Sequence, residues 1–233
     1  MWNEGEPVGA IVVSGGASGL GAAVVRAVRK AGGVAVVLDR DEPAECDDFV
    51  RVDLADPRAA EHAVREIADR NGGLDGVVTA AGTDRCGELS TIDGAEWDRV
   101  VTVNLLGTAA VVRAALPYLI DSRGRIVTVA STLGFSAVSD ATAYCASKFG
   151  VVGFTRALTA ELTGRVGVTL LVPGGMRTKF FDDREERYKP PDDARLNDPD
   201  DVAAAVVFAL SQPGNCELRE LVVTHAEEGS WPP

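Results

Sequence analysis

The sequence has few of the residues that bind metals, span membranes or contact nucleic acids. It contains two histidines and four cysteines, and no cysteine pair has the spacing of a metal site or a redox motif. We therefore expect no metal site. We also expect the four cysteines to be reduced thiols, as in proteins of a reducing compartment. No apolar run approaches the roughly 18 residues that a membrane-spanning helix needs, so no membrane partner is expected.

Basic residues are also scarce. The 23 Lys and Arg stand against 35 Asp and Glu, and the resulting net charge of −12 would repel the phosphates of nucleic acid. The first seven residues, Met-Trp-Asn-Glu-Gly-Glu-Pro, are acidic where a secretory signal is basic, and the apolar residues 8–13 are too few for a signal core. These absences predict a cytoplasmic protein with no nucleic-acid partner.

Length and composition are those of one globular domain. With 233 residues, of which 46% are hydrophobic and 25% charged, the chain fits a single domain over residues 1–233. The one long irregular stretch is 178–197, which is rich in charge and contains two adjacent prolines. Because loops of this length in a compact domain are usually functional or disordered, we interpret residues 178–198 as a lid over a substrate.

Short apolar runs alternate with helical segments along the chain. Most runs are continuous rather than alternating, as is typical of strands covered on both faces in a parallel sheet. This repetition predicts an α/β, Rossmann-like, doubly wound fold with about seven parallel strands flanked by helices on both faces. The expected strands are 9–13, 34–38, 49–52, 76–79, 125–129, 168–172 and 221–224, and the expected helices are 20–31, 57–70, 94–119, 144–162 and 199–210.

A glycine-rich turn directly follows the first expected strand. In the sequence Ser-Gly-Gly-Ala-Ser-Gly-Leu-Gly, Gly15 can turn the chain and Gly19 lets backbone N–H groups approach a pyrophosphate. Gly21 lets the next helix pack closely, and Ser18 and Leu20 lie within the same turn. The alternative is a tight turn without a ligand, but the place at the first strand–helix junction favours a dinucleotide.

Acidic residues end the second and third strands. Asp39 can accept hydrogen bonds from both ribose hydroxyls of an adenosine and would repel a 2′-phosphate, which favours NAD over NADP. Arg40 follows and is able to hold that phosphate instead, whereas Ser18 adds no cation. Asp53 and Leu54 are placed to contact the adenine, although Asp53 could equally cap the helix that begins near Asp56 and Pro57.

The residues that suit proton transfer lie in the second half of the chain. Tyr144 and Lys148, at i and i+4, share one face of a helix, where an ammonium can make a phenol a better base. Taken alone, this spacing is equally that of an ordinary pair on a helix surface. Ser131 ends a strand thirteen residues earlier and could polarise a substrate oxygen. Asn104 lies among apolar residues and is either a packing amide bonded to nearby backbone or the holder of a water that connects the lysine to solvent.

The order of these features resembles that of the short-chain dehydrogenases/reductases over essentially the whole chain. The resemblance is carried by the glycine turn, Asp39, Asp53, Ala80-Ala81-Gly82, Asn104, Ser131, Tyr144, Lys148 and Pro173-Gly174. It implies an oxidoreductase that transfers a hydride between NAD and a secondary alcohol or ketone.

The resemblance also implies a role for each residue. Tyr144 would be the general acid/base and Ser131 would orient the substrate oxygen. Lys148 would bind the nicotinamide ribose and lower the tyrosine pKa, and Asn104 would hold the proton-relay water. Further cofactor contacts are implied for Ala81, Gly82, Pro173, Gly174 and Thr178.

Three segments depart from the family pattern. Thr79-Ala80-Ala81-Gly82 replaces Asn-Asn-Ala-Gly, which should reduce the side-chain contacts that brace the central sheet. Val172 stands where an Asn usually precedes Pro-Gly, and residues 224–233 lack the usual Asp-Gly-Gly ending. Trp231, in that last segment, either docks into a neighbouring subunit or belongs to a disordered tail.

The substrate pocket is expected to be partly apolar. Arg184, Arg187 and Lys189 could meet an anionic substrate, but the acidic residues beside them favour a solvated lid of mixed charge. Phe180 and Phe181 either line the pocket or anchor the lid on the body. The other expected wall residues are Phe135, Val138, Met176, Tyr188 and the segments 86–89 and 175–176.

Two alternatives to the NAD-dependent dehydrogenase remain. The first is an NADPH-dependent ketoreductase, in which Arg40 would have to bind the 2′-phosphate despite the charge of Asp39. The second is a dinucleotide-binding sensor without turnover, in which the proton-transfer residues would have no role. The resemblance further implies a homodimer or homotetramer built through the helices at 96–119 and 144–162. The small apolar faces of these helices either suit such pairing or pack on their own sheet.

Overall fold

The computed structural model describes residues 8–229 and 231–232, so the prediction about the first seven residues lies outside the described part. Seven strands form one sheet in the order β3-β2-β1-β4-β5-β6-β7, and every neighbouring pair is parallel. This confirms the predicted doubly wound α/β class. The strands are β1 (Ala10–Ser14), β2 (Val34–Asp39), β3 (Asp48–Arg51), β4 (Gly76–Thr79), β5 (Arg125–Val129), β6 (Gly167–Pro173) and β7 (Glu220–Val223).

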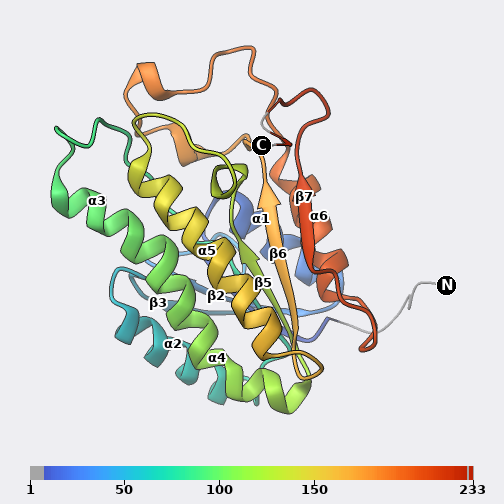
Figure 1. The fold of residues 1–233 in the computed structure, drawn as a ribbon. Helices are drawn as coiled ribbons and strands as arrows, with labels where there is room; N and C mark the ends of the chain where they lie inside the picture. The colour runs from blue at the N-terminus through green and yellow to red at the C-terminus, as the bar shows by residue number, and fades with distance from the viewer. Residues whose placement is uncertain (1–7, 230, 233) are drawn as a thin grey trace.

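Helices cover both faces of the sheet. In Figure 1, α4 and α5 lie in front of the sheet beside α2, and α1 and α6 pack together on the opposite face. The helices are α1 (Gly19–Lys30), α2 (Pro57–Arg70), α3 (Gly94–Val101), α4 (Thr108–Ser122), α5 (Thr142–Glu161) and α6 (Pro199–Leu210), with the short turns η1 (Thr102–Gly107), η2 (Thr132–Gly134), η3 (Lys179–Phe181) and η4 (Glu186–Tyr188).

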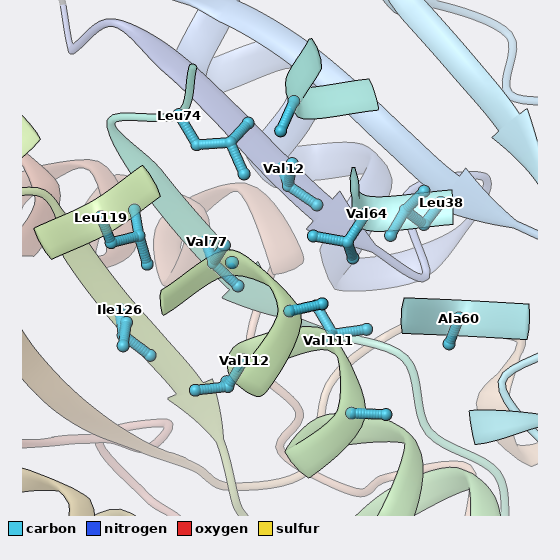
Figure 2. Packing of buried hydrophobic residues seen from close by; sticks show 14 of the residues in the cluster. Val12, Leu38, Ala60, Val64, Leu74, Val77, Val111, Val112, Leu119 and Ile126 are labelled. Carbon is cyan, nitrogen blue, oxygen red and sulfur yellow. The ribbon is translucent and has the colours of Figure 1, made fainter. Parts of the chain in front are cut away.

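The apolar runs are continuous because each strand feeds two cores. Val12 and Val77 belong to the cluster under α2 and α4, which Figure 2 shows. Their chain neighbours Val13 and Val78 belong to the cluster under α1 and α6 on the other face. Successive side chains of a strand point to opposite faces, so a strand covered on both sides has no polar positions to alternate with.

The predicted helix 94–119 differs from the structure in its interior. It is a chain of α3, η1 and α4 from Gly94 to Ser122, and η1 is a π-helical stretch that no apolar period reveals. Contrary to the prediction, this stretch is long and apolar enough to cross a membrane by length and composition. Of its most apolar window 56% is buried inside the fold, and the core helix of a globular protein meets the same criterion.

Thr79, one of the departures from the family pattern, lies in the central sheet without the contacts of an amide. Ser14 of β1 and Thr79 of β4 are paired in the register, and both side chains are buried. Within the described residues neither hydroxyl has a hydrogen-bond partner. This agrees with the expectation that Thr79 braces the sheet less than the amide it replaces.

Candidate functional site

The strand order reverses beside β1, and this is where the site lies. The connection after β1 leads to β2 on one side, whereas β4 pairs with β1 on the other. Ligands of doubly wound folds bind at the carboxyl ends of the strands next to such a switch point. A cleft of about 1010 Å³ opens there, and of the candidate residues only Gly21 and Asn104 do not line it.

The glycines of the turn after β1 allow close backbone packing and leave the N-terminus of α1 without a side-chain cap. Gly15 has a φ of 75° and Gly19 a φ of 51°, a region that favours glycine. A Cβ on Gly21 would overlap the carbonyl oxygen of Gly15, so Gly21 serves the packing of α1 on its own turn. The residue at the N-cap of α1, Ser18, makes no side-chain cap hydrogen bond, and the first turn contains no acidic residue.

The other helix starts show why this N-terminus is distinctive. Asp56, Asp93 and Asp198 each accept hydrogen bonds from the first backbone N–H groups of α2, α3 and α6. The N–H groups at the start of α1 lack such a carboxylate, and Gly19 and Leu20 of this first turn line the cleft. An uncapped helix N-terminus of this kind suits a phosphate anion.

Asp39 is fixed at the end of β2. Its carboxylate oxygens accept hydrogen bonds from the backbone N–H of Ala17, at 2.9 Å, and of Asp41, at 3.1 Å. These bonds hold the carboxylate against the glycine turn, at one end of the cleft. Arg40 lines the same end, but its side chain is 67% exposed and contacts only Asp41 among the described ion-pair partners.

Asp53 and Leu54 occupy the next strand end. Asp53 forms an ion pair with Arg99 at 2.9 Å and accepts a hydrogen bond from the N–H of Ala55. Burial alone would raise its pKa, but the bonds from Ala55 and Arg99 outweigh this and lower it. The helix-cap alternative is wrong, because Asp56 caps α2. Leu54 is buried below Asp53 and packs against Gly107.

The four expected catalytic residues come from three elements. Ser131 follows β5 and begins η2, where its Oγ accepts a hydrogen bond from the N–H of Leu133 at 3.1 Å. Tyr144 and Lys148 lie on the first turns of α5, and the Lys148 ammonium is 5.6 Å from the centre of the tyrosine ring. The Nζ of Lys148 donates a hydrogen bond to the carbonyl oxygen of Val129 at 2.9 Å.

Burial dominates the titration of this group. It raises the pKa of Tyr144 to about 12, against the effect of a hydrogen bond with Ser131, which lowers it. Asp84 raises the tyrosine pKa further and Arg184 lowers it. Burial also lowers the pKa of Lys148 to about 8. The expected lowering of the tyrosine pKa by Lys148 is therefore not what the protein alone shows, because desolvation of the phenolate is the larger effect.

Asn104 is fully buried in η1, and its side chain bridges two elements. Its Oδ1 accepts a hydrogen bond from Thr83 N–H at 2.8 Å, and its Nδ2 donates to the Thr83 carbonyl at 2.9 Å and to Ser147 Oγ at 3.0 Å. These contacts fit the packing alternative, since they tie the segment after β4 to α5. The water-holding role stays a prediction.

The segment after β4 brings Asn104 and Lys148 together around one glycine. A Cβ built on Gly82 would lie 3.6 Å from Asn104 Oδ1 and 3.7 Å from Lys148 Nζ, so the glycine lines the cleft between them. Ala81 packs its backbone against Gly15 across the switch point. Both expected cofactor contacts, Ala81 and Gly82, therefore line the cleft.

The end of β6 carries the remaining cofactor candidates. Pro173 and Gly174 are buried and line the cleft. The side chain of Thr178 accepts a hydrogen bond from Phe180 N–H. The same side chain lies 3.5 Å from the position that a Cβ on Gly19 would occupy. Sequence reasoning missed one neighbour here. Glu228 contacts the backbone of Gly174 and Gly175 from the C-terminal segment.

The segment 178–198, which the sequence analysis interprets as a lid, is tied to the body by an ion pair that the sequence did not predict. Arg184 binds Asp84 at 2.6 Å, and the two side chains are only 18% and 2% exposed. The guanidinium also lies over Phe181, at 4.6 Å from its ring centre, and over Phe180 at 5.4 Å. The prediction of a solvated lid is thus wrong for Arg184, whereas Arg187 is exposed beside Glu185.

Phe180 has both of its expected roles. Its ring is 5.7 Å from that of Tyr144, and it lines the cleft while it stacks on Arg184. The contact with Tyr144 joins the segment 178–198 to α5, and the same ring forms part of the cleft wall. Phe181, Met176, Tyr188, Cys86 and Gly87 also line the cleft, as expected.

Other expected wall residues lie elsewhere. Val138 is 52% exposed and Leu89 66%, and neither lines the cleft. Phe135 packs edge-on against Trp231 at 5.3 Å and lies outside the cleft wall. Trp231 therefore packs onto its own chain, which contradicts the disordered-tail alternative for this residue, and a contact with a neighbouring subunit stays a prediction.

These features recur in known proteins. The sequence matches the family described as short chain dehydrogenase over residues 9–189. It is 33% identical to the L-fucose dehydrogenase of Mus musculus over 94% of this chain and 88% of that protein. An alcohol dehydrogenase of Thermococcus sibiricus, solved with 5-hydroxy-NADP, has a TM-score of 0.83 at 22% identity over 94% of this chain and 97% of its own.

A second solved structure is similar at higher identity. A metagenomic short-chain oxidoreductase in complex with NADP has a TM-score of 0.80 and 26% identity, and the match covers 95% of this chain and 98% of that one. The family match, the identity to the mouse relative and the shared seven-stranded architecture agree. The chain belongs to the short-chain dehydrogenase family of oxidoreductases.

Proposed function

We propose that the protein is an NAD-dependent dehydrogenase that interconverts a secondary alcohol and its ketone, with Tyr144 as the general acid/base. One observation carries the proposal. Ser131, Tyr144 and Lys148 converge at one end of a cleft whose other end is bounded by Asp39. A proton-transfer group and a ribose-binding carboxylate are what hydride transfer with a dinucleotide requires at these two ends.

The residues of the cleft fit such a cofactor. The uncapped N-terminus of α1 offers backbone N–H groups to a pyrophosphate, and Asp39 offers a fixed carboxylate to a ribose. Gly82 leaves space beside Lys148, whose ammonium would bind the second ribose. When bound, the nicotinamide supplies or accepts the hydride.

The protein's own residues would move the proton. With a pKa of about 12, the phenol of Tyr144 is protonated at neutral pH, ready to donate to a ketone oxygen. In the direction of oxidation the phenol must first lose its proton, and the hydrogen bond with Ser131 favours that phenolate. The Lys148 ammonium, 5.6 Å from the ring centre, adds favourable charge.

NADP is the alternative cofactor. The metagenomic relative was solved with NADP, and Arg40 lines the ribose end of the cleft. We favour NAD because the Asp39 carboxylate is anchored by two backbone N–H groups, whereas the Arg40 side chain extends into solvent. A carboxylate held at this place would repel a 2′-phosphate.

The first experiment is a titration of the purified protein with NADH and with NADPH, followed by nicotinamide fluorescence. We expect tight NADH and weak NADPH binding; the opposite preference would favour the ketoreductase. A panel of secondary alcohols with NAD, including L-fucose because of the mouse relative, then tests turnover. Binding without turnover on any alcohol would favour the sensor, and binding of neither dinucleotide would contradict the proposal.

A further inference from the structure

The chain after β7 turns back toward the cleft. The N–H of Glu228 donates to the carbonyl of His225 at 2.9 Å, which closes a turn. Glu227 forms an ion pair with Arg195 of the lid at 2.9 Å, and Trp231 packs on Phe135. Contacts on both sides of Glu228 therefore set the course of this segment.

The side chain of Glu228 lies against the backbone that follows β6. Its Oε1 accepts a hydrogen bond from Gly175 N–H at 3.2 Å. A Cβ on Gly174 would overlap the carboxylate, so only glycine at this position leaves it space. Glu228 is half-buried and lines the same cleft as Tyr144 and Pro173.

The register of the sheet tells which end of the cleft this is. Val129 of β5 pairs with Leu171 of β6, so Ser131 and Pro173, each two residues farther on, lie at the same height. Asp39 is on β2, four strands from β6, which is on the order of 19 Å at about 4.8 Å per strand. Glu228 is thus at the Ser131 end, where the hydride-carrying ring has to meet the substrate.

We propose that Glu228 determines redox-state specificity, by making the cleft bind the oxidised, cationic nicotinamide more tightly than the reduced, neutral one. The inference rests on the proposed function, because it concerns the cofactor of the same site. A carboxylate in a partly desolvated cleft attracts a nearby cation more strongly than it would in water. The reduced ring has no charge for it to attract, so the effect differs between the two forms.

The test compares Glu228→Gln with the unchanged protein. The amide keeps the shape of the side chain and an oxygen for Gly175 N–H but removes the charge. Dissociation constants are measured for the oxidised and the reduced form of whichever dinucleotide binds, by fluorescence for the reduced form and by its displacement for the oxidised form. We expect the oxidised form to bind about five- to twentyfold more weakly and the reduced form to change less than about twofold.

Glu227→Gln is the matched control, since it removes the neighbouring carboxylate, which pairs with Arg195 at the surface. Its ratio of dissociation constants should equal that of the unchanged protein. Equal weakening of both forms in Glu228→Gln would mean a purely structural role and would overturn the inference, as would an unchanged ratio. If the unchanged protein binds no dinucleotide, the proposed function fails first and the inference with it.

Discussion

The buried ammonium of Lys148 donates a hydrogen bond to the carbonyl oxygen of Val129, 2.9 Å away. Only 4% of Lys148 is exposed, and within the described residues no charged partner shifts its pKa. One neutral carbonyl replaces little of the hydration that the cation loses on folding. Burial accordingly lowers its pKa from 10.5 to about 8.

We expect Lys148→Met to be more stable than the unchanged protein at pH 7, by about 1–3 kcal/mol. Below pH 8 the folded protein must carry the buried cation. Between pH 8 and 10.5 the unfolded chain binds more protons than the folded one, so the stability of the unchanged protein rises with pH there. The advantage of the variant should shrink over that window, which urea denaturation at several pH values measures.

The exposed Lys30, at the end of α1, provides the control for this experiment. Lys30→Met should follow the unchanged protein at every pH. Measurements stay below about pH 10, because the raised pKa of Tyr144 withdraws stability above that value in all three proteins. Parallel curves for Lys148→Met and the unchanged protein would contradict the prediction.

Replacing Tyr144 by Phe should separate binding from chemistry. We expect kcat to fall by about 10²–10⁴ because the proton donor is lost, with the dinucleotide dissociation constant nearly unchanged. Tyr118→Phe is the control, since Tyr118 donates to Asp69 on the surface far from the cleft. Equal losses of binding and turnover in Tyr144→Phe would show that the residue is structural.

Asp39→Ala tests the choice of cofactor. Without the carboxylate, the repulsion of a 2′-phosphate disappears and Arg40 remains, so the affinity ratio of NADPH to NADH should rise on the order of tenfold. Glu45→Ala removes a carboxylate that is 55% exposed, pairs with Arg29 and does not line the cleft, so it should leave the ratio close to its starting value. Identical ratios in the two variants would remove the argument for NAD.

The ion pair between Asp84 and Arg184 should be costly to break on one side. Arg184→Met leaves a carboxylate that is 2% exposed without its cation, and we expect a loss of about 3–5 kcal/mol in the free energy of unfolding. The double variant Asp84→Leu/Arg184→Met should recover most of that loss. We also expect faster proteolysis within 178–198 and a higher KM in the single variant. Additive losses in the double variant would contradict a coupled pair.

The helices at 96–119 and 144–162 are the proposed subunit interface. Leu106 of η1 is 49% exposed and Phe149 of α5 46%, so each of these segments carries a large apolar side chain that its own chain leaves exposed. We propose that a homodimer or homotetramer covers them. Light scattering of the purified protein gives its mass, and Phe149→Lys should lower it to that of smaller species. Val138→Lys, at another exposed apolar side chain, should not.

Local sequence determined the elements and the contacts that lie within one of them. The bounds of β4, β5, α2 and α6 agree with the sequence prediction, because apolar runs, glycines and Asp-Pro caps mark them locally. Tyr144 and Lys148 share a helix face through their spacing alone. The sequence order also placed the glycine turn, Asp39 and Ser131 at strand ends, which a parallel sheet brings to one edge.

Tertiary structure decided the contacts between segments far apart in the chain. Asp84 meets Arg184 across 100 residues, and Glu228 meets Gly175 across 53. Trp231 contacts Phe135 in the same way. These residues lie in irregular segments, where no hydrophobic periodicity indicates which way a side chain faces. A loop takes its course from what it packs against, so its own sequence does not indicate which distant residues it contacts. The pKa of Tyr144 has the same origin, because desolvation depends on all the surrounding chain rather than on the residue at i+4.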